Sequence, residues 1–120
     1  MTDRPAKQLM ILIGHADTWH ERPLYEAIVD ALEKHGVAGA SVLTGIIGYG
    51  SHRHVHRKGL FGVSDDKPVA IVAIDTEAKL RAAVDVIRPM VREGLIALSD
   101  IEVILQASES DSESSETPSV

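Results

Sequence analysis

The sequence predicts a single α+β domain whose elements follow in the order β-α-β-β-α-β. Short apolar runs bounded by Gly, Pro, Asp or Ser recur along the chain and are typical of strands. Two longer segments repeat apolar residues every three or four positions, which is the pattern of an amphipathic helix. Two successive β-α-β units predict a four-stranded antiparallel sheet with both helices on one face, the ferredoxin-like arrangement. We assign this domain to residues 1–105.

The first β-α-β unit occupies the N-terminal part of the chain. Leu9–Ile13 is wholly apolar and ends at Gly14, so we predict a strand there. Pro23 opens the predicted helix, because its missing N–H costs nothing in the first turn. Gly36 is placed to end that helix in a left-handed conformation. The apolar, β-branched stretch Ser41–Ile47 is the next predicted strand.

The second unit follows a long loop, Gly48–Lys67. Val69–Ile74 is an unbroken apolar run and predicts a strand. Helical spacing predicts a helix over Glu77–Glu93, and Pro89 should kink it because proline cannot donate the backbone hydrogen bond. The last predicted strand is Ile101–Leu105.

The two central strands lack the alternation that a wetted sheet face requires. Leu9–Ile13 and Val69–Ile74 are apolar at successive positions and would therefore be apolar on both faces. Because both helices cover the same face, something else must cover the second one. In a chain of 120 residues, the expected cover is another copy of the same chain, which predicts a homo-oligomer.

The charge of the chain is concentrated at its C-terminal end. The formal net charge is −6, and the last fifteen residues contain four acidic residues and no Lys or Arg. Residues 106–120 are Ser-rich, acidic and poor in large apolar residues, so we predict a disordered tail. The remaining domain is close to neutral, which argues against a nucleic-acid partner.

The composition also suggests where the protein works. The chain has no cysteine, and no basic segment followed by a long apolar core is visible at its N-terminus. The run Leu9–Ile13 is far shorter than the roughly 20 apolar residues that a membrane span needs. We therefore expect a cytoplasmic protein.

A glycine-rich stretch from Gly36 to Gly62 contains seven of the nine glycines and three of the six histidines. Within it, Gly36–Val42 and Gly48-Tyr49-Gly50 resemble the passage from strand to loop in the PII nitrogen-signalling proteins. The chain is also similar over residues 7–105 to the PII-like family called domain-of-unknown-function family 190. The runs that carry this similarity are Pro23–Val29, Gly36–Leu43 and Gly45–His52.

The resemblance implies a homotrimer whose sheets face inward and which binds adenine nucleotides in clefts between subunits. One wall of the cleft would contain Gly39 and Ser41, followed by Gly48, Tyr49, Gly50, Ser51 and His52 at the base of the long loop. The loop Ser51–Asp66 would change its order when an effector binds and would dock on a partner. By the same resemblance, the partner would be a membrane transporter or channel.

The sequence departs from the PII pattern at the opposite wall of that cleft. A phosphate-holding loop of PII proteins reads like G-D-G-K, whereas the corresponding stretch here, Glu93–Asp100, has one glycine and no lysine. A phosphate cradle needs successive free N–H groups and usually a cation. We therefore expect a nucleotide with fewer phosphates than ATP, or another small anion.

Three alternating histidines in the long loop offer an alternative function. If the segment is extended, His52, His54 and His56 point to one side and form a plausible facial set for Zn²⁺, Cu²⁺ or Ni²⁺. Two arginines and a lysine near them would repel a cation, so a solvated polar loop that binds no metal is the competing interpretation.

The sequence offers little sign of catalysis. Four polar residues follow the first predicted strand and could serve as metal ligands or as an acid–base pair, although an exposed polar loop is the simpler interpretation: His15, Asp17, His20 and Glu21. The sequence shows no Ser-His-Asp pattern and no evident nucleophile. We therefore expect that the protein is not an enzyme.

Overall fold

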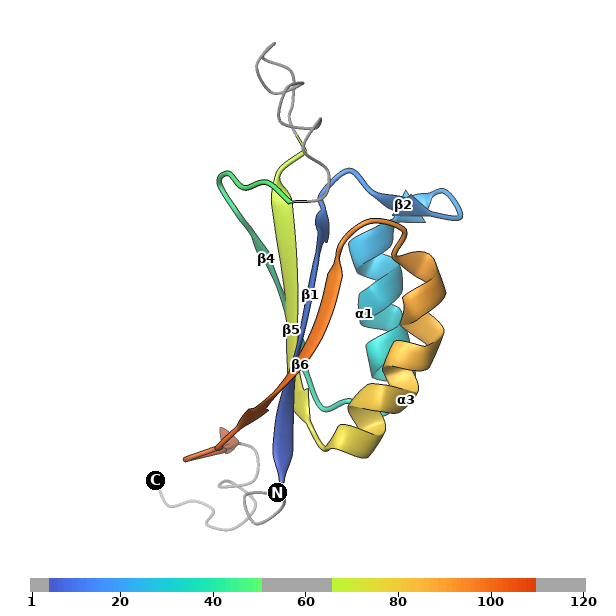
Figure 1. The fold of residues 1–120 in the computed structure, drawn as a ribbon. Coiled ribbons are helices and arrows are strands. Elements are labelled where there is room, and N and C mark those ends of the chain that lie inside the picture. Colours follow the sequence, from blue (N-terminus) through green and yellow to red (C-terminus); the bar gives the residue numbers. More distant parts are fainter. Residues whose placement is uncertain (1–4, 51–65, 110–120) are drawn as a thin grey trace.

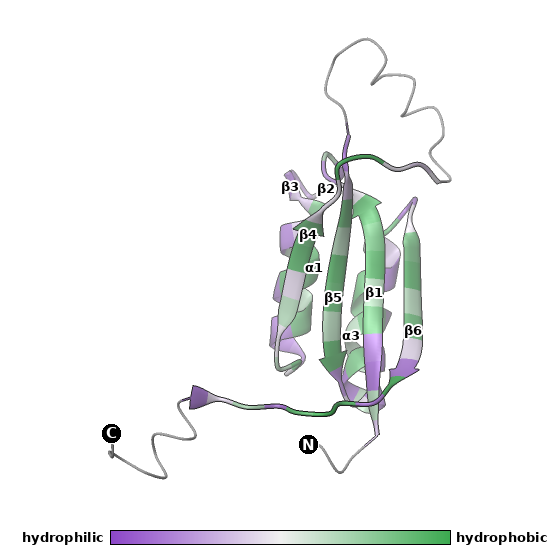
Figure 2. Ribbon diagram, turned by 90° about the vertical axis from the view of Figure 1, so that its left-hand side faces the viewer, coloured by the Kyte–Doolittle hydropathy of each residue, from purple (hydrophilic) through white to green (hydrophobic). Residues whose placement is uncertain are grey.

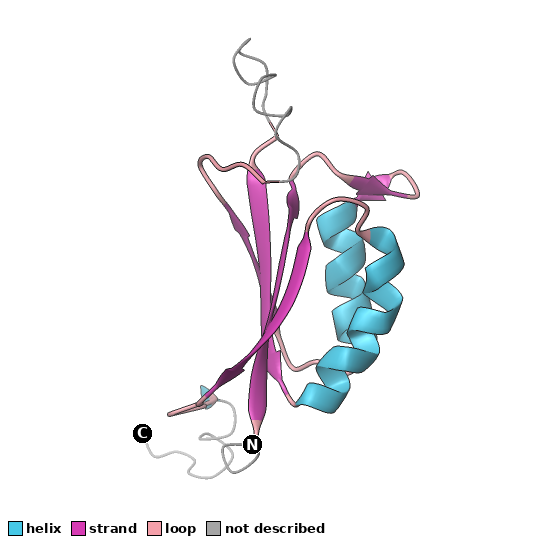
Figure 3. Cartoon of the chain, in the orientation of Figure 1, coloured by secondary structure: helices cyan, strands magenta, loops and turns pink. Residues whose placement is uncertain are grey.

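The computed structural model describes residues 5–50 and 66–109, and its main feature is a four-stranded antiparallel sheet with two helices on one face (Figure 1, Figure 3). The strand order is β4-β5-β1-β6. The helices are α1 (Leu24–Lys34) and α3 (Glu77–Ile87). The strands of this sheet are β1 (Ala6–Gly14), β4 (Ala40–Thr44), β5 (Pro68–Asp75) and β6 (Leu95–Ile101). The predicted ferredoxin-like α+β fold is confirmed.

A small hairpin interrupts the connection between β1 and α1. It pairs β2 (Thr18–Trp19) with β3 (Arg22–Pro23). The two turn residues, His20 and Glu21, have φ angles of 52° and 67°. Two successive positive φ values define the tight turn that matches the twist of a hairpin, although non-glycine residues adopt them at a cost. The sequence predicted an exposed polar loop here, whereas the structure has this hairpin.

The helix boundaries follow from proline and glycine. The α1 helix begins directly after Pro23, and the chain leaves it through Gly36, whose φ is 79°. The α3 helix starts behind the capping residue Thr76, whose side chain accepts a hydrogen bond from Lys79 N–H. The prediction that this helix continues to Glu93 was wrong: it ends at Ile87, and Pro89 lies in a 3₁₀ turn, η1 (Arg88–Met90).

The predicted last strand, Ile101–Leu105, was wrong as well. The strand β6 is Leu95–Ile101, and it pairs with β1 from Leu12↔Leu95 to Ala6↔Ile101. Beyond that pair the neighbour on β1 is Pro5, which has no N–H to donate. The strand prediction Ser41–Ile47 was also too long, because β4 ends at Thr44 and Gly45 N–H makes the last bond to the carbonyl of Pro68.

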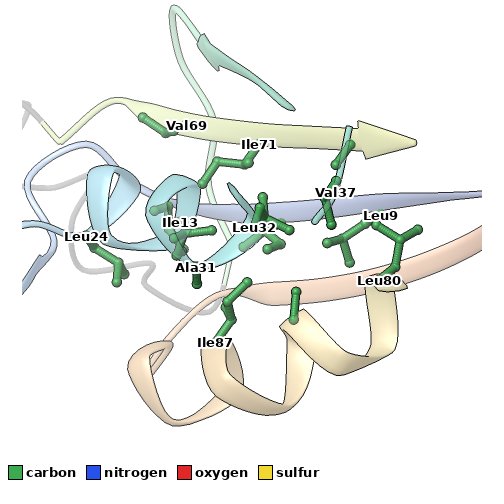
Figure 4. Packing of buried hydrophobic residues seen from close by; sticks show 14 residues of the cluster. Leu9, Ile13, Leu24, Ala31, Leu32, Val37, Val69, Ile71, Leu80 and Ile87 are labelled. Carbon is green, nitrogen blue, oxygen red and sulfur yellow. The ribbon is translucent and has the colours of Figure 1, made fainter. Parts of the chain in front are cut away.

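The core lies between the sheet and the helices. Alternate residues of β1 and β5 point toward α1 and α3, as the two-residue period of a strand requires (Figure 4). The largest fully buried side chains come from both layers: Leu9, Ile11, Ile28, Leu32, Val69, Ile71, Leu80 and Ile87. Their removal from water is the main favourable contribution to folding.

The opposite face of the sheet is uncovered and apolar. Figure 2 views this face and shows hydrophobic residues along β4, β5, β1 and β6. The pairings Met10↔Val72, Leu12↔Ala70 and Gln8↔Ile74 place the intervening residues of β1 and β5 on it. Leu43 of β4 and Leu95 of β6 extend it to both edges, and both are half-exposed. The predicted lack of alternation thus produces a second apolar face.

Neither helix is long and apolar enough to cross a membrane, within the part of the chain that the structure describes.

Asp75 ties two connections of the fold together. It is 4% exposed, and its carboxylate accepts hydrogen bonds from Ala38 N–H at 2.8 Å and Thr76 N–H at 2.7 Å. Ala38 lies between α1 and β4, whereas Thr76 lies between β5 and α3. The carboxylate therefore satisfies backbone donors from both β-α-β units, as a buried polar group must.

We predict that Asp75→Ala destabilises the protein by about 2 kcal/mol, because hydrogen bonds to a charged group are lost and two N–H groups are left without this acceptor. Urea unfolding followed by circular dichroism measures this change. The matched control is Asp85→Ala, which removes an exposed carboxylate of α3 and should change the free energy of unfolding by less than about 0.5 kcal/mol. Equal midpoints for both variants would contradict the role assigned to Asp75.

Candidate functional site

The predicted rim, Gly36–Gly50, surrounds one edge strand of the sheet. Gly39 directly precedes β4, and Gly48, Tyr49 and Gly50 follow its end, so that these residues and Ser41 share the β4 edge. A Cβ added to Gly39 or Gly50 would meet nothing within 4 Å, whereas Gly45 and Gly48 lie against the ring of Pro68. The first two glycines leave open space, and the other two allow a close approach of chain segments.

The side chains of the rim are turned toward solvent in the single chain. Tyr49 is 79% exposed, and Ile46 and Ile47 are more exposed still. Ser41 is exposed and pairs with Val72, which places it on the uncovered face of the sheet. Figure 1 shows the segment after β4 on the side away from the helices. Ser51 and His52, the remaining residues of the predicted wall, lie outside the described residues.

The predicted opposite wall is not a loop. Of the stretch Glu93–Asp100, the residues from Leu95 onward belong to β6. The strand order β4-β5-β1-β6 makes β4 and β6 the two edges of the sheet. Three strand spacings separate these edges, which is roughly 14 Å. The two predicted walls therefore do not face each other within one chain.

An open cavity of about 490 Å³ lies on the helix side of the same end of the molecule. Three segments that are far apart in the sequence form it: the β1–β2 connection, the start of α1 and the residues after η1. The lining residues are Ala16, Asp17, Thr18, Leu24, Met90, Arg92 and Glu93. Arg92, which stands two residues before Gly94, was not predicted as a site residue, because no sequence motif links it to the rest of the lining.

Asp17, one of the four polar residues considered as ligands or acid–base groups, organises the turn after β1. Its carboxylate accepts from Gly14 N–H at 3.0 Å, and its carbonyl accepts from Leu24 N–H at 2.8 Å. Two of the others stack on aromatic rings: His15 on Tyr25 at 5.5 Å and His20 on Trp19 at 4.3 Å between ring centroids. Within residues 5–50 and 66–109, no three His, Cys, Asp or Glu side chains are grouped to hold a metal ion.

The C-terminal base of the long loop is bonded to the wall of this cavity. The Asp66 carboxylate accepts a hydrogen bond from Ala16 N–H at 2.8 Å, and the Lys67 carbonyl accepts one from His15 N–H at 2.9 Å. Asp66 also packs directly over Gly14, where an added Cβ would stand 2.5 Å from a carboxylate oxygen. The absence of a side chain at Gly14 thus allows this close approach.

Shifted pKa values occur at the other end of the sheet. The hydrogen bond between Lys7 and Asp100, which pair across β1 and β6, raises the pKa of the Lys7 ammonium and lowers that of the Asp100 carboxyl. A hydrogen bond from Arg81 at 2.6 Å lowers the pKa of Glu77, which also lies 3.7 Å from Lys7. Only the Lys7–Asp100 pair joins β1 to β6, and none of these residues lines the cavity.

The predicted metal ligands His52, His54 and His56 lie outside the described residues, so the metal site stays a prediction. The same applies to the predicted tail beyond residue 109.

Comparison with known proteins identifies relatives along nearly the whole domain. A UPF0166 protein of Aquifex aeolicus (strain VF5) is 31% identical over 98 residues, which cover 82% of this chain and 92% of the relative. The solved structure of CPII from Thiomonas intermedia K12, bound to ADP and bicarbonate, is 25% identical with a TM-score of 0.59 and covers 83% of this chain and 89% of CPII. CPII is called a nitrogen regulatory PII-like protein.

A more distant structure shares the fold alone. The divalent ion tolerance protein CutA1 from Ehrlichia chaffeensis is 15% identical with a TM-score of 0.52, over 87% of this chain and 86% of CutA1. By contrast, the family model for DUF190, described as "Uncharacterized ACR, COG1993", matches residues 6–103. The chain therefore belongs to the DUF190 family of PII-like proteins.

Proposed function

We propose that this protein is a cytoplasmic PII-like regulator that forms a homotrimer and binds a small effector, an adenine nucleotide, in clefts between its subunits. The observation that carries the proposal is the position of the two candidate walls on opposite edges of one sheet. A cleft that contains both walls needs the β4 edge of one copy and the β6 edge of another. CPII, which was solved with ADP, supports the choice of ligand class.

The uncovered face of the sheet supports self-association. Leu12, Leu43, Ile74 and Leu95 are large apolar residues on this face that a single chain leaves exposed. Contiguous apolar surfaces of this kind are typical of interfaces. Three copies with their sheets facing inward would cover this surface and would place each β4 edge beside a neighbouring subunit.

Arg92 is the candidate phosphate ligand. It lines the cavity, precedes β6 and makes no ion pair or hydrogen bond with another residue of the described ranges. A planar guanidinium binds phosphate oxygens in a bidentate manner. A single arginine that is unpaired within residues 5–50 and 66–109, in place of a glycine-rich cradle with a lysine, fits ADP or AMP better than ATP.

Regulation would pass through the loop Ser51–Asp66. Gly48–Gly50 directly precede that loop, and Asp66 at its other end is hydrogen-bonded to Ala16 N–H. An effector that contacts these two places would act on both ends of the loop. By resemblance to PII proteins, the partner is a membrane transporter or channel, and the protein acts by binding without catalysis.

The trimer can be tested on the uncovered face. We expect light scattering at micromolar concentration to give the mass of three chains for the wild type. Leu43→Asp should lower that mass to one chain, because a charge would be buried at the interface without a partner. Val86→Asp is the matched control, since Val86 is an exposed apolar residue on α3, and it should remain a trimer. A wild-type mass of one chain would overturn this part of the proposal.

The nucleotide site can be tested on Gly39, because a side chain at this position fills open space in the single chain. ADP and AMP should raise the melting temperature of the wild type, since a ligand that binds only the folded protein stabilises it. Gly39→Val should weaken ADP binding at least about tenfold, or roughly 1.4 kcal/mol, without lowering the melting temperature of the free protein. Calorimetric titration measures the affinity.

Two further variants complete this test. Ala82→Val adds the same side chain to an exposed position of α3 and should bind ADP like the wild type. Arg92→Gln should weaken ADP more than AMP, because it removes a cation from the phosphates. If neither nucleotide binds to the wild type at millimolar concentration, the effector is not an adenine nucleotide.

The metal-binding alternative makes a separate prediction. If His52, His54 and His56 form a site, Zn²⁺ should bind to the wild type at micromolar concentration and His54→Ala should abolish that heat of binding. His35→Ala is the control, because the His35 ring is bonded to the Ala31 carbonyl at 2.9 Å, far along the chain from the loop. An absence of heat in the wild type would remove this alternative.

A further inference from the structure

Of the four polar residues that follow the first predicted strand, Asp17 is the one that lines the cavity. Three hydrogen bonds fix its position. Its N–H donates to the Gly14 carbonyl at 3.1 Å, its carbonyl accepts from Leu24 N–H at 2.8 Å, and the carboxylate oxygen Oδ2 accepts from Gly14 N–H at 3.0 Å. The side chain is half-buried. The carboxylate is therefore held in one orientation before a ligand arrives.

The second carboxylate oxygen of Asp17, Oδ1, is available to a ligand. Within residues 5–50 and 66–109, the only hydrogen bond of this carboxylate is the one from Gly14 N–H to Oδ2. An ionised carboxylate accepts hydrogen bonds and cannot donate them. The natural partner of Oδ1 is consequently a ligand group that donates, such as a hydroxyl.

The cavity combines groups of opposite charge. Asp17 belongs to the β1–β2 connection, whereas Arg92 and Glu93 precede β6, and Figure 1 shows these two connections at the same end of the helix layer. Leu24 and Met90 add apolar surface to the lining. A ligand that is only an anion would be repelled by the two carboxylates. A ligand with donors at one end and an anionic group at the other matches both Asp17 and Arg92.

A ribose phosphate has this polarity. Its hydroxyls can donate to a carboxylate, and its phosphate accepts from a guanidinium. Acidic side chains bind ribose hydroxyls in the same way in dinucleotide-binding folds. A site that pairs a polar group with a ligand hydroxyl also disfavours an analogue that lacks this hydroxyl, because the polar group is then left without its partner.

We propose that Asp17 binds the ribose hydroxyls of the nucleotide, so that the site selects ribonucleotides over nucleotides without these hydroxyls. This inference rests on the proposed nucleotide site and adds to it a residue that determines specificity. Arg92 would hold the phosphates in the same cavity. Because Asp17 is half-buried and partly hydrated, we expect a preference of about tenfold or more, in the range of one hydrogen bond to a charged group.

A comparison of two nucleotides on the wild-type protein tests this preference without any substitution. ADP and 2′,3′-dideoxy-ADP share the base and both phosphates and differ only in the ribose hydroxyls. Calorimetric titration of the full-length chain should give an affinity for ADP at least about tenfold higher. Equal affinities would overturn the role of Asp17 and leave the nucleotide site standing. If ADP itself does not bind, the proposed function fails, and this inference fails with it.

Asp17→Asn separates ligand binding from the structural role of Asp17. The Gly14 N–H needs an acceptor, so the amide oxygen should stay on it and the NH₂ group should replace Oδ1. The variant should keep the wild-type circular dichroism spectrum and bind the two nucleotides with affinities within about twofold of each other. Asp85→Asn is the matched control on an exposed position of α3 and should keep the preference for ADP.

Asp17→Ser provides a second variant, because a serine hydroxyl can accept a bond in the same kind of turn. It should also lose the preference for ADP. If folded Asp17→Asn or Asp17→Ser protein retains the wild-type preference, another group holds the ribose and the proposal is wrong.

Discussion

The structure depends on one constraint: its two central strands are apolar on both faces. In the middle of these strands, the residues that face the helices are fully buried, as Ile11 and Ile71 are, and the residues beside them on the other face, such as Met10 and Ala70, are also apolar. A single layer of two helices covers only one side of a sheet. The other side remains apolar and exposed in a single chain. The proposed self-association follows from this exposed surface, and the proposed site between subunits follows from the self-association.

The same constraint separates the parts of the candidate site. A four-stranded sheet has two edges, and the glycine-rich rim and the start of β6 lie on different ones. A helix or a loop of the same chain cannot bring them together, because β5 and β1 lie between them. Association through the uncovered face would bring edges of different copies close to each other. The association that buries the apolar face would thus also bring the two walls of the candidate site together.

The sequence predicted those elements whose limits are set locally. Pro23 and Gly36 define α1, and the apolar runs locate β1 and β5, because burial on both faces gives an unbroken signal. The end of β6 could not be predicted in this way. Ile101–Leu105 has the stronger strand composition, but Pro5 ends the ladder, and only the pairing with β1 reveals this. Long-range pairing decided the boundary against local propensity.

The candidate site also has a part that local sequence predicts and a part that only the fold brings together. Gly39 and Gly48–Gly50 were recognisable because glycine marks close approach in the sequence itself. The cavity was not recognisable, because Asp17, Leu24 and Arg92 are brought together by the fold and share no motif. The β2–β3 hairpin was missed since its turn residues, His20 and Glu21, are not those that usually adopt positive φ.

The hydrogen bonds at the base of the long loop indicate how much free energy an effector would need to change the position of the loop. Asp66 accepts from Ala16 N–H, and Ala16 lines the cavity with Arg92. A hydrogen bond to a carboxylate contributes about 1.5–3 kcal/mol, and coupling between sites typically amounts to about 1–3 kcal/mol. One such bond is therefore sufficient to link the occupancy of the cavity to the base of the loop. A ligand that moved Ala16 would weaken its hydrogen bond to Asp66 without any rearrangement of the core.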